Sequence, residues 1–174
     1  RYATIQNGQL YCSDHSIAQA GKGGWVTPLA IDPSDPDILY IATDVIRKST
    51  DRMVSWTTIG DFGNNYKKAL AVADSDPAYI YASEGGKVWK TINGGDSWTE
   101  ISNGLPELTV TSIAVHPLKP EIIAVSLSGY TKGEKVYISY NAGFTWSNYS
   151  MNLPNIPANT VVFGQHDNNP LYVG

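Results

Sequence analysis

The chain has 174 residues, about the size of one ordinary domain, and its composition of 42% hydrophobic and 16% charged residues is that of a globular protein. The formal net charge is −4 and Lys and Arg are scattered along the chain, which excludes a nucleic-acid partner because phosphate binding needs a clustered basic surface. No apolar run of about 18 residues is present, so we expect no membrane insertion.

The residues that commonly bind metals are few and far apart. Cys12 is the single cysteine, and the three histidines, His15, His116 and His166, are well separated in the chain. No spacing typical of a metal site results. We therefore expect neither a metal nor another cofactor.

An eight-residue segment occurs three times in the chain. The copies are STDRMVSW (49–56), TINGGDSW (91–98) and SYNAGFTW (139–146). They share a hydroxyl residue, Asp or Asn two positions later, Ser or Thr six positions later and Trp seven positions later. This self-similarity indicates a repeat architecture.

A second marker recurs in register with the first. A short apolar segment runs into a polar turn closed by proline, after which another apolar segment begins; the prolines are Pro36, Pro77, Pro120 and Pro170. Each unit then reads as four strands joined by turns. The expected strands are 26–31, 38–43, 45–50 and 55–60 in the first unit, 68–73, 78–83, 87–92 and 97–102 in the second, and 111–116, 121–126, 135–140 and 145–150 in the third.

Four antiparallel strands in 40 to 50 residues are typical of a propeller blade. We predict an all-β fold, a partial β-propeller of about four blades' worth, divided into a partial blade at 1–21, three blades at 22–63, 64–107 and 108–157, and a partial blade at 158–174. Residues 1–17 resemble the second and third strands of an earlier blade. Because the final LYVG stops within an apolar strand, we expect a fragment of a longer propeller, whose open edges pair with the rest of the parent protein or with another copy.

Each constant position of the repeated segment can be explained by a structural role in a turn. The Asx residue can bond backbone N–H groups two positions on, the hydroxyls can join that set, and glycine suits a positive φ. The tryptophan opens the fourth strand and offers an apolar face for packing. We assign a structural role to Ser49, Asp51, Trp56, Thr91, Asn93, Gly95, Trp98, Ser139, Asn141, Gly143 and Trp146.

The segments resemble the Asp-box, or BNR repeat, of sialidases and related propellers, S-x-D-x-G-x-T-W. Met53 departs from this pattern because it stands where the family has glycine, so either the backbone differs there or Met53 is strained. In those families the box lies on the face away from the active site. The resemblance thus points to the opposite face, formed by the turns between the second and third strands and by the links between blades.

Residues of these turns and links are the candidate ligand-binding side chains. They are Trp25, Tyr66, Glu84, Tyr130 and Lys132, with Asp44 as a candidate catalytic residue. Ligands in propellers usually meet this face because variable loops converge there. The competing interpretation for each residue is a solvated turn or a packing aromatic.

Two enzyme families share the resemblance. Sialidases need a cluster of three arginines. This chain has three arginines in total, Arg1, Arg47 and Arg52, and the last two lie in an expected strand and in a repeated segment, so a sialidase function is disfavoured. Residues 23–45 resemble the first blade of glycoside hydrolase family 74 (GH74), an endo-glucanase or xyloglucanase family. The resemblance implies that Asp44 is the general base of inverting hydrolysis, whose second carboxylate comes from a propeller that this chain lacks.

Val45 and Ile46 stand where that family has a Gly-rich loop, so we do not expect catalysis by this chain alone. An Asp44 that opens into a groove beside exposed aromatic side chains would favour catalysis, whereas one that bonds backbone N–H groups of its own turn would oppose it. The chain also resembles sortilin-type receptor domains, photosystem assembly factors and, most of all, secreted BNR-repeat or putative glycosyl hydrolase proteins of Bacteroidetes. That resemblance implies a secreted or cell-surface module that binds a protein or polysaccharide, or acts as a scaffold.

Overall fold

The computed structural model describes residues 2–6, 9–13, 23–63 and 65–174 of the chain. Over these residues all regular secondary structure is β-strand, which confirms the predicted all-β class. The strands are β1 (Tyr2–Gln6), β2 (Gln9–Ser13), β3 (Leu29–Ile31), β4 (Leu39–Ala42), β5 (Ile46–Ser49), β6 (Thr57–Gly60), β7 (Ala69–Val72), β8 (Ile80–Glu84), β9 (Lys87–Thr91), β10 (Thr99–Glu100), β11 (Val110–His116), β12 (Lys119–Leu127), β13 (Val136–Ser139), β14 (Ser147–Asn148), β15 (Val161–Phe163) and β16 (Leu171–Val173).

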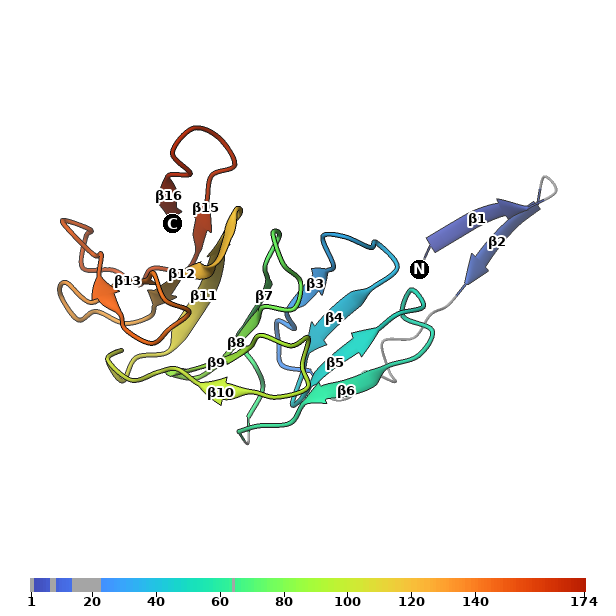
Figure 1. Cartoon of the computed structure of the whole chain (residues 1–174), viewed down its shortest axis with the longest axis horizontal. Helices are drawn as coiled ribbons and strands as arrows, with labels where there is room; N and C mark the ends of the chain where they lie inside the picture. The colour runs from blue at the N-terminus through green and yellow to red at the C-terminus, as the bar shows by residue number, and fades with distance from the viewer. Residues whose placement is uncertain (1, 7–8, 14–22, 64) are drawn as a thin grey trace.

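The strands form three four-stranded antiparallel sheets and two antiparallel pairs. In each full sheet the strands lie side by side in chain order: β3 to β6 make the first blade, β7 to β10 the second and β11 to β14 the third. The pairs are β1–β2 and β15–β16. Figure 1 shows the three blades and the β15–β16 pair following one another along an arc. This arrangement is the predicted partial β-propeller.

The hydrophobic core lies between neighbouring blades rather than within one. A small cluster joins the first blade to the second through Ala42, Ile46 and Ala82, with Ile59, Phe62, Leu70 and Trp98 packed around it. A larger one joins the second blade to the third, and another joins the third to β15–β16. A single sheet cannot bury both of its faces, so each blade is stabilised by its neighbours.

The repeated turn satisfies its own polar groups. In the second blade the Thr91 hydroxyl donates to Asn93 Oδ1 at 2.7 Å and accepts from the Gly95 N–H at 3.0 Å. Asn93 Oδ1 also accepts from the Ser97 N–H at 3.0 Å, and Asn93 Nδ2 donates to Ser97 Oγ at 2.9 Å. The third blade repeats this set of bonds through Ser139, Asn141, Gly143 and Thr145. The first blade does so through Ser49, Asp51, Met53 and Ser55, except that the Ser55 hydroxyl donates to Asp51 Oδ2. The side-chain polar groups of the turn therefore find their hydrogen-bond partners within the turn.

Met53 adopts the same backbone as the glycines in the sister turns. Its φ is 69°, while Gly95 and Gly143 have φ values of 108° and 81°. Of the two explanations for Met53, the altered backbone is thus excluded. A side chain in this left-handed region is disfavoured by roughly 1–2 kcal/mol, so Met53 is strained.

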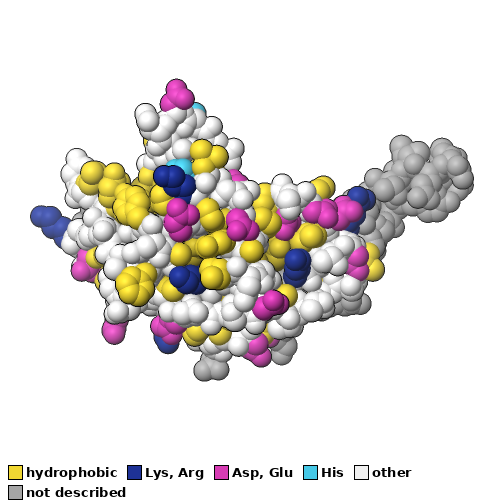
Figure 2. Space-filling model, viewed as in Figure 1, with side chains coloured by type: hydrophobic (Ala, Val, Ile, Leu, Met, Phe, Trp, Pro, Cys, Tyr) yellow, Lys and Arg dark blue, Asp and Glu magenta, His cyan; other side chains and the backbone are white. Residues whose placement is uncertain are grey.

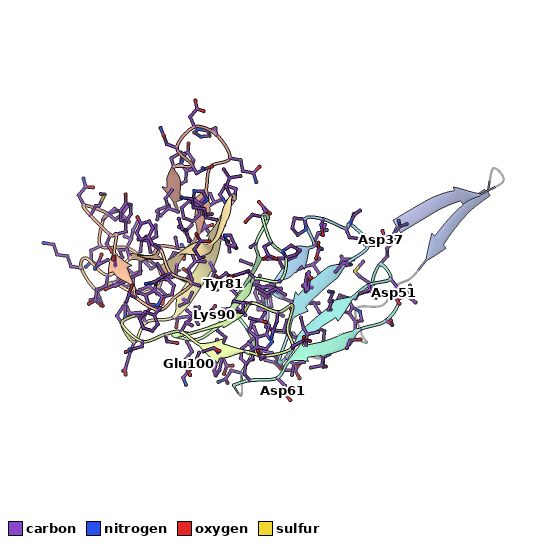
Figure 3. All side chains as sticks on the ribbon, viewed as in Figure 1. Asp37, Asp51, Asp61, Tyr81, Lys90 and Glu100 are labelled. Carbon is purple, nitrogen blue, oxygen red and sulfur yellow. The ribbon has the colours of Figure 1, made fainter. Side chains whose placement is uncertain are left out.

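Each repeated turn lies beside the turn between the first two strands of its own blade. The Arg52 N–H donates to the Asp37 carbonyl at 3.1 Å, and the Gly94 N–H donates to the Ala78 carbonyl at 3.0 Å. Figure 3 shows Asp37 and Asp51 at the same end of the first blade. The turns between the second and third strands, together with the links between blades, occupy the opposite end.

Candidate functional site

A cleft of about 570 Å³ opens on the face that carries the links between blades. It lies between the link that joins β6 to β7 and the turn that joins β8 to β9. Its lining residues are Gly24, Trp25, Val26, Asn65, Tyr66, Lys67, Lys68, Glu84, Gly85, Gly86, Lys87 and Thr109. Three of the predicted ligand-binding residues, Trp25, Tyr66 and Glu84, are brought together here.

Two aromatic side chains stand at the mouth of the cleft. Trp25 is fully exposed, and Tyr66 is about half exposed. The segment that carries Trp25 lies against Tyr66, because a Cβ added at Gly24 would be 3.4 Å from the Tyr66 Cβ. A large aromatic ring exposed at the edge of a cleft that combines apolar surface with a few polar groups is a typical feature of a ligand-binding surface.

A buried ion pair forms the floor of the cleft. Lys67 Nζ donates to Glu84 Oε2 at 3.0 Å, and the exposed fractions of the two side chains are 0% and 9%. The same ammonium group donates to the carbonyl oxygens of Asp44 at 2.8 Å, Phe62 at 2.7 Å and Asn65 at 3.1 Å. Lys67 therefore ties the β4–β5 turn of the first blade to the end of β8 in the second.

Glu84 is held by the link as well as by Lys67. Its Oε1 accepts from the backbone N–H of Asn65 at 2.9 Å and from Asn65 Nδ2 at 3.2 Å. Gly63 passes so close that a Cβ there would stand 1.7 Å from Glu84 Oε2, and its φ is 70°. The carboxylate is thus enclosed, and it positions the floor of the cleft rather than reaching out of it.

Asp44 occupies the β4–β5 turn and does not line the cleft. Its Oδ1 accepts from the Thr43 hydroxyl at 2.8 Å, from the Val45 N–H at 3.0 Å and from Arg47 at 3.3 Å. The Thr43 hydrogen bond, with help from Arg47 and Val45, lowers the pKa of Asp44. The side chain is about half exposed, and no hydrogen bond from a described residue reaches Oδ2. Asp44 therefore caps its turn with one oxygen and presents the other to solvent.

Tyr130 and Lys132 belong to the β12–β13 loop and do not line this cleft. Both side chains are exposed. Lys67 and Asn65 were not among the residues predicted from sequence. A lysine in a link between strands reads as a solvated side chain, and no feature of its sequence neighbourhood signals that four oxygen acceptors will surround it.

Within the described residues, no three or more His, Cys, Asp or Glu side chains gather into a group that could hold a metal ion. In the same part of the chain, no helix is long and apolar enough to cross a membrane. On the face drawn in Figure 2, acidic and basic side chains are interspersed. Such a surface offers no continuous basic stripe of the kind that tracks a phosphate backbone.

The fold is that of a partial β-propeller, and the solved structures that it resembles include propellers of glycoside hydrolases. An ancestral GH74 enzyme superposes with a TM-score of 0.70 and 25% identity, covering 88% of this chain and 22% of that enzyme. The GH74 enzyme of Niastella koreensis gives a TM-score of 0.66 at 22% identity, covering 84% of this chain and 25% of its own, a likeness that concerns the fold alone.

A sequence relative points the same way. A xyloglucanase of Hypocrea jecorina (strain QM6a) is 32% identical over a 105-residue alignment, which covers 54% of this chain and 12% of the xyloglucanase. No protein-family model matches the chain. This chain thus spans about one eighth of that relative.

Proposed function

We propose that this chain is part of the substrate-binding propeller of a GH74-like glycoside hydrolase, and that its cleft binds a polysaccharide of the xyloglucan class. The observation that carries the proposal is the cleft itself, with Trp25 and Tyr66 at its mouth and the Lys67–Glu84 pair beneath it. The similarity to a xyloglucanase supports the choice of substrate.

The chemistry of the cleft suits a sugar chain. A pyranose ring has an apolar face that can stack on an indole or phenol, while its hydroxyls need hydrogen-bonding partners. Lys68, Lys87 and Thr109 line the cleft beside the aromatic pair and can supply such partners. Apolar surface combined with a few placed polar groups is the usual composition of a ligand site.

Binding of tamarind xyloglucan in affinity gel electrophoresis tests this function. We expect Trp25→Ala and Tyr66→Ala each to weaken the affinity for xyloglucan, determined from the retardation, by roughly five- to thirtyfold. This is the effect of losing about 1–2 kcal/mol of aromatic contact. Phe144→Ala is the matched control, because Phe144 is an exposed aromatic side chain in the repeated turn. Equal retardation of all variants would rule out this cleft as the binding site.

A catalytic role for Asp44 is a second candidate, favoured by one specific observation. One carboxylate oxygen is held by the turn while the other stays open to solvent. The lowered pKa of Asp44 makes it a weaker base than an ordinary aspartate, so the pKa shift does not itself favour the catalytic role. The turn-capping bonds favour the structural role, so Asp44 is the residue whose function most needs a direct test.

The test is hydrolysis of xyloglucan by the full-length protein with and without Asp44→Asn. A general base predicts a loss of kcat of about 10²-fold or more, and Asp61→Asn, an exposed aspartate in the link after β6, serves as control. Unchanged kcat in Asp44→Asn would leave Asp44 with its turn-capping role only.

We further propose that the three repeated turns are Asp-boxes of the BNR type and that the protein is secreted or displayed at the cell surface. The self-satisfied hydrogen bonds of the turns support the first statement, and the resemblance to secreted repeat proteins supports the second. Fractionation of the native host into cytoplasm, envelope and medium tests the location. Recovery in the cytoplasm alone would refute it.

A further inference from the structure

A second groove, of about 620 Å³, lies on the outer rim of the molecule between the first and second blades. One wall is the outer strand β6 of the first blade, and the other is formed by Trp89 of β9 and by the repeated turn of the second blade, which ends at Trp98. Figure 1 shows β6 and β10 along the outer edge of the arc. This rim groove shares no lining residue with the cleft described above.

Three aromatic rings form a continuous surface in the rim groove. Phe62, from the link that follows β6, stacks on Trp89 with ring centroids 4.6 Å apart and an angle of 24° between the ring planes. Phe62 also packs against Trp98, with centroids 5.0 Å apart and an angle of 49°. All three side chains are half-buried, so each presents part of its ring to the groove.

The repeat accounts for one of these rings. Trp98, like Trp146 in the third blade, donates its indole N–H to a backbone carbonyl of the preceding blade. The acceptors are Ile59 at 2.6 Å and Ile101 at 2.8 Å. Trp98 therefore has a structural role that does not depend on a ligand.

No such role accounts for Trp89. Two positions before the repeated segment, where Trp89 stands, the first blade has Arg47 and the third has Tyr137. The indole N–H of Trp89 is buried and has no hydrogen-bond acceptor among the residues that the structure describes. An unpaired buried donor lowers stability, and a phenylalanine could stack on Phe62 without that loss. Stability does not explain a tryptophan here, whereas the ring surface that it adds to the groove does.

The polar groups of the rim groove suit a neutral sugar chain. Thr57 and Thr58 lie on one wall and Asp96 on the other, and all three side chains are exposed. Val54 and Phe144 occupy the position of Asp96 in the other two repeated turns, so the turn itself does not require this carboxylate. Among the described residues that line the groove there is no lysine or arginine, which disfavours an anionic ligand. Aromatic rings can stack on a pyranose, while the hydroxyls and the carboxylate bind its hydroxyl groups.

We propose that the rim groove is a second binding site for a neutral polysaccharide, the same chain that occupies the cleft. The choice of polysaccharide rests on the proposed function. Continuity between the two sites supports this occupant, because the link between β6 and β7 contributes Phe62 to the groove and Tyr66 to the cleft. The Phe62 carbonyl also accepts from Lys67 Nζ, beneath the cleft, at 2.7 Å. A long chain that crosses this link occupies both sites and binds more tightly than a short oligosaccharide, which occupies one.

Binding by the full-length protein, measured with tamarind xyloglucan and with short oligosaccharides released from it, tests the proposal. Trp89→Leu keeps an apolar side chain but removes the ring, and Asp96→Ala removes an exposed carboxylate. We expect each to weaken the affinity for the polymer by roughly three- to tenfold and to leave the affinity of the cleft for the short oligosaccharides unchanged. Trp89→Tyr, which introduces the residue type of the third blade, should retain most of the affinity. Asp167→Ala, at an exposed aspartate between β15 and β16, is the control and should change neither affinity.

The same measurements separate the rim groove from the cleft. Trp25→Ala should weaken binding of both the polymer and the short oligosaccharides, because it alters the cleft. Loss of affinity in Trp25→Ala alone, with Trp89→Leu and Asp96→Ala unchanged, would overturn the second site and leave the proposed function standing. Loss in the two groove variants alone would support the groove and refute the cleft. Competition by polylysine that Asp96→Ala abolishes would also overturn the proposal, because the rings and the carboxylate would then hold a cation.

Discussion

Replacing Lys67 by methionine should destabilise the protein far more than the same replacement in an exposed ion pair. Lys67 Nζ has Glu84 and three carbonyl oxygens as partners, and its side chain has no exposure. Methionine keeps the length of the side chain but leaves a buried carboxylate without its cation. Breaking a buried pair by removing one partner costs about 3–5 kcal/mol.

Lys87 provides the matched control. Its Nζ lies 3.1 Å from Glu100 Oε2, almost the same distance as in the Lys67 pair, but the two side chains are 60% and 37% exposed. Exposed pairs contribute about 0–1 kcal/mol, so Lys87→Met should change stability by no more than that. The two variants therefore differ in burial and not in the length of the ion pair.

Thermal unfolding followed by circular dichroism measures the difference. For a chain of this size, 1 kcal/mol corresponds to roughly 2–4 °C in Tm, so Lys67→Met should lower Tm by roughly 6–20 °C and Lys87→Met by less than about 4 °C. Similar shifts in the two variants would refute the reasoning, because they would mean that the Lys67 network does not hold the first two blades together.

Three further outcomes are expected. In the 174-residue chain Met53→Gly should raise stability by about 1 kcal/mol, seen as a higher urea midpoint; an unchanged midpoint would mean that Met53 is not strained. Gly95→Ala should lower the urea midpoint more than Gly94→Ala, because a Cβ at Gly95 meets Ile59 whereas one at Gly94 meets nothing within 4 Å. Equal losses of stability would show that backbone strain alone, and not contact with Ile59, determines the effect. Hydrogen bonds from the Ser55 hydroxyl and N–H, and from Ser49, lower the pKa of Asp51 from 3.8 to about 2, so its stabilising effect is complete above the unfolded pKa and is lost as pH falls through about 2. Tm measured between pH 4 and pH 2 should therefore drop less in Asp51→Asn than in the parent chain, and parallel curves would contradict the assignment.

The repeat made most of the fold predictable, because the spacing of turns and apolar segments is a local property of the sequence. The outer strands are the main difference. We predicted them over 97–102 and 145–150, yet β10 and β14 contain two residues each. Beyond them, serine side chains take the place of ladder bonds: Ser102 Oγ accepts from the Val88 N–H, and Ser150 Oγ accepts from the N–H groups of Lys135 and Val136.

The turn closed by Pro120 also differs from the prediction. The strand was expected to begin after this proline, at Glu121, but β12 begins at Lys119. The pairing passes from His116–Lys119 to Val115–Ile123 through an irregularity, and Pro120 lies in this gap, where its missing N–H costs no ladder bond. A bulge of this kind depends on the partner strand, so the proline by itself did not indicate it.

The candidate site was predictable in its location but not in its construction. Turns and links on one face follow from the order of strands, and that reasoning brought Trp25, Tyr66 and Glu84 to one cleft. The pairing of Glu84 with Lys67 could not be foreseen, because Lys67 lies in the link before β7 and the strand pattern does not specify the path of a link across the end of a blade. The role of Asp44 remains a prediction that the proposed assay decides.

The bond that the repeated-turn tryptophans of the second and third blades make to the preceding blade determines where a substitution in the turn takes effect. Trp98 and Trp146 follow their carbonyl partners by 39 and 45 residues. The short outer strand of one blade is therefore secured by a side chain that belongs to the next. A substitution in a repeated turn should therefore destabilise the outer strand of the blade that precedes it in the chain. Trp98→Phe should accordingly speed backbone hydrogen exchange in β6.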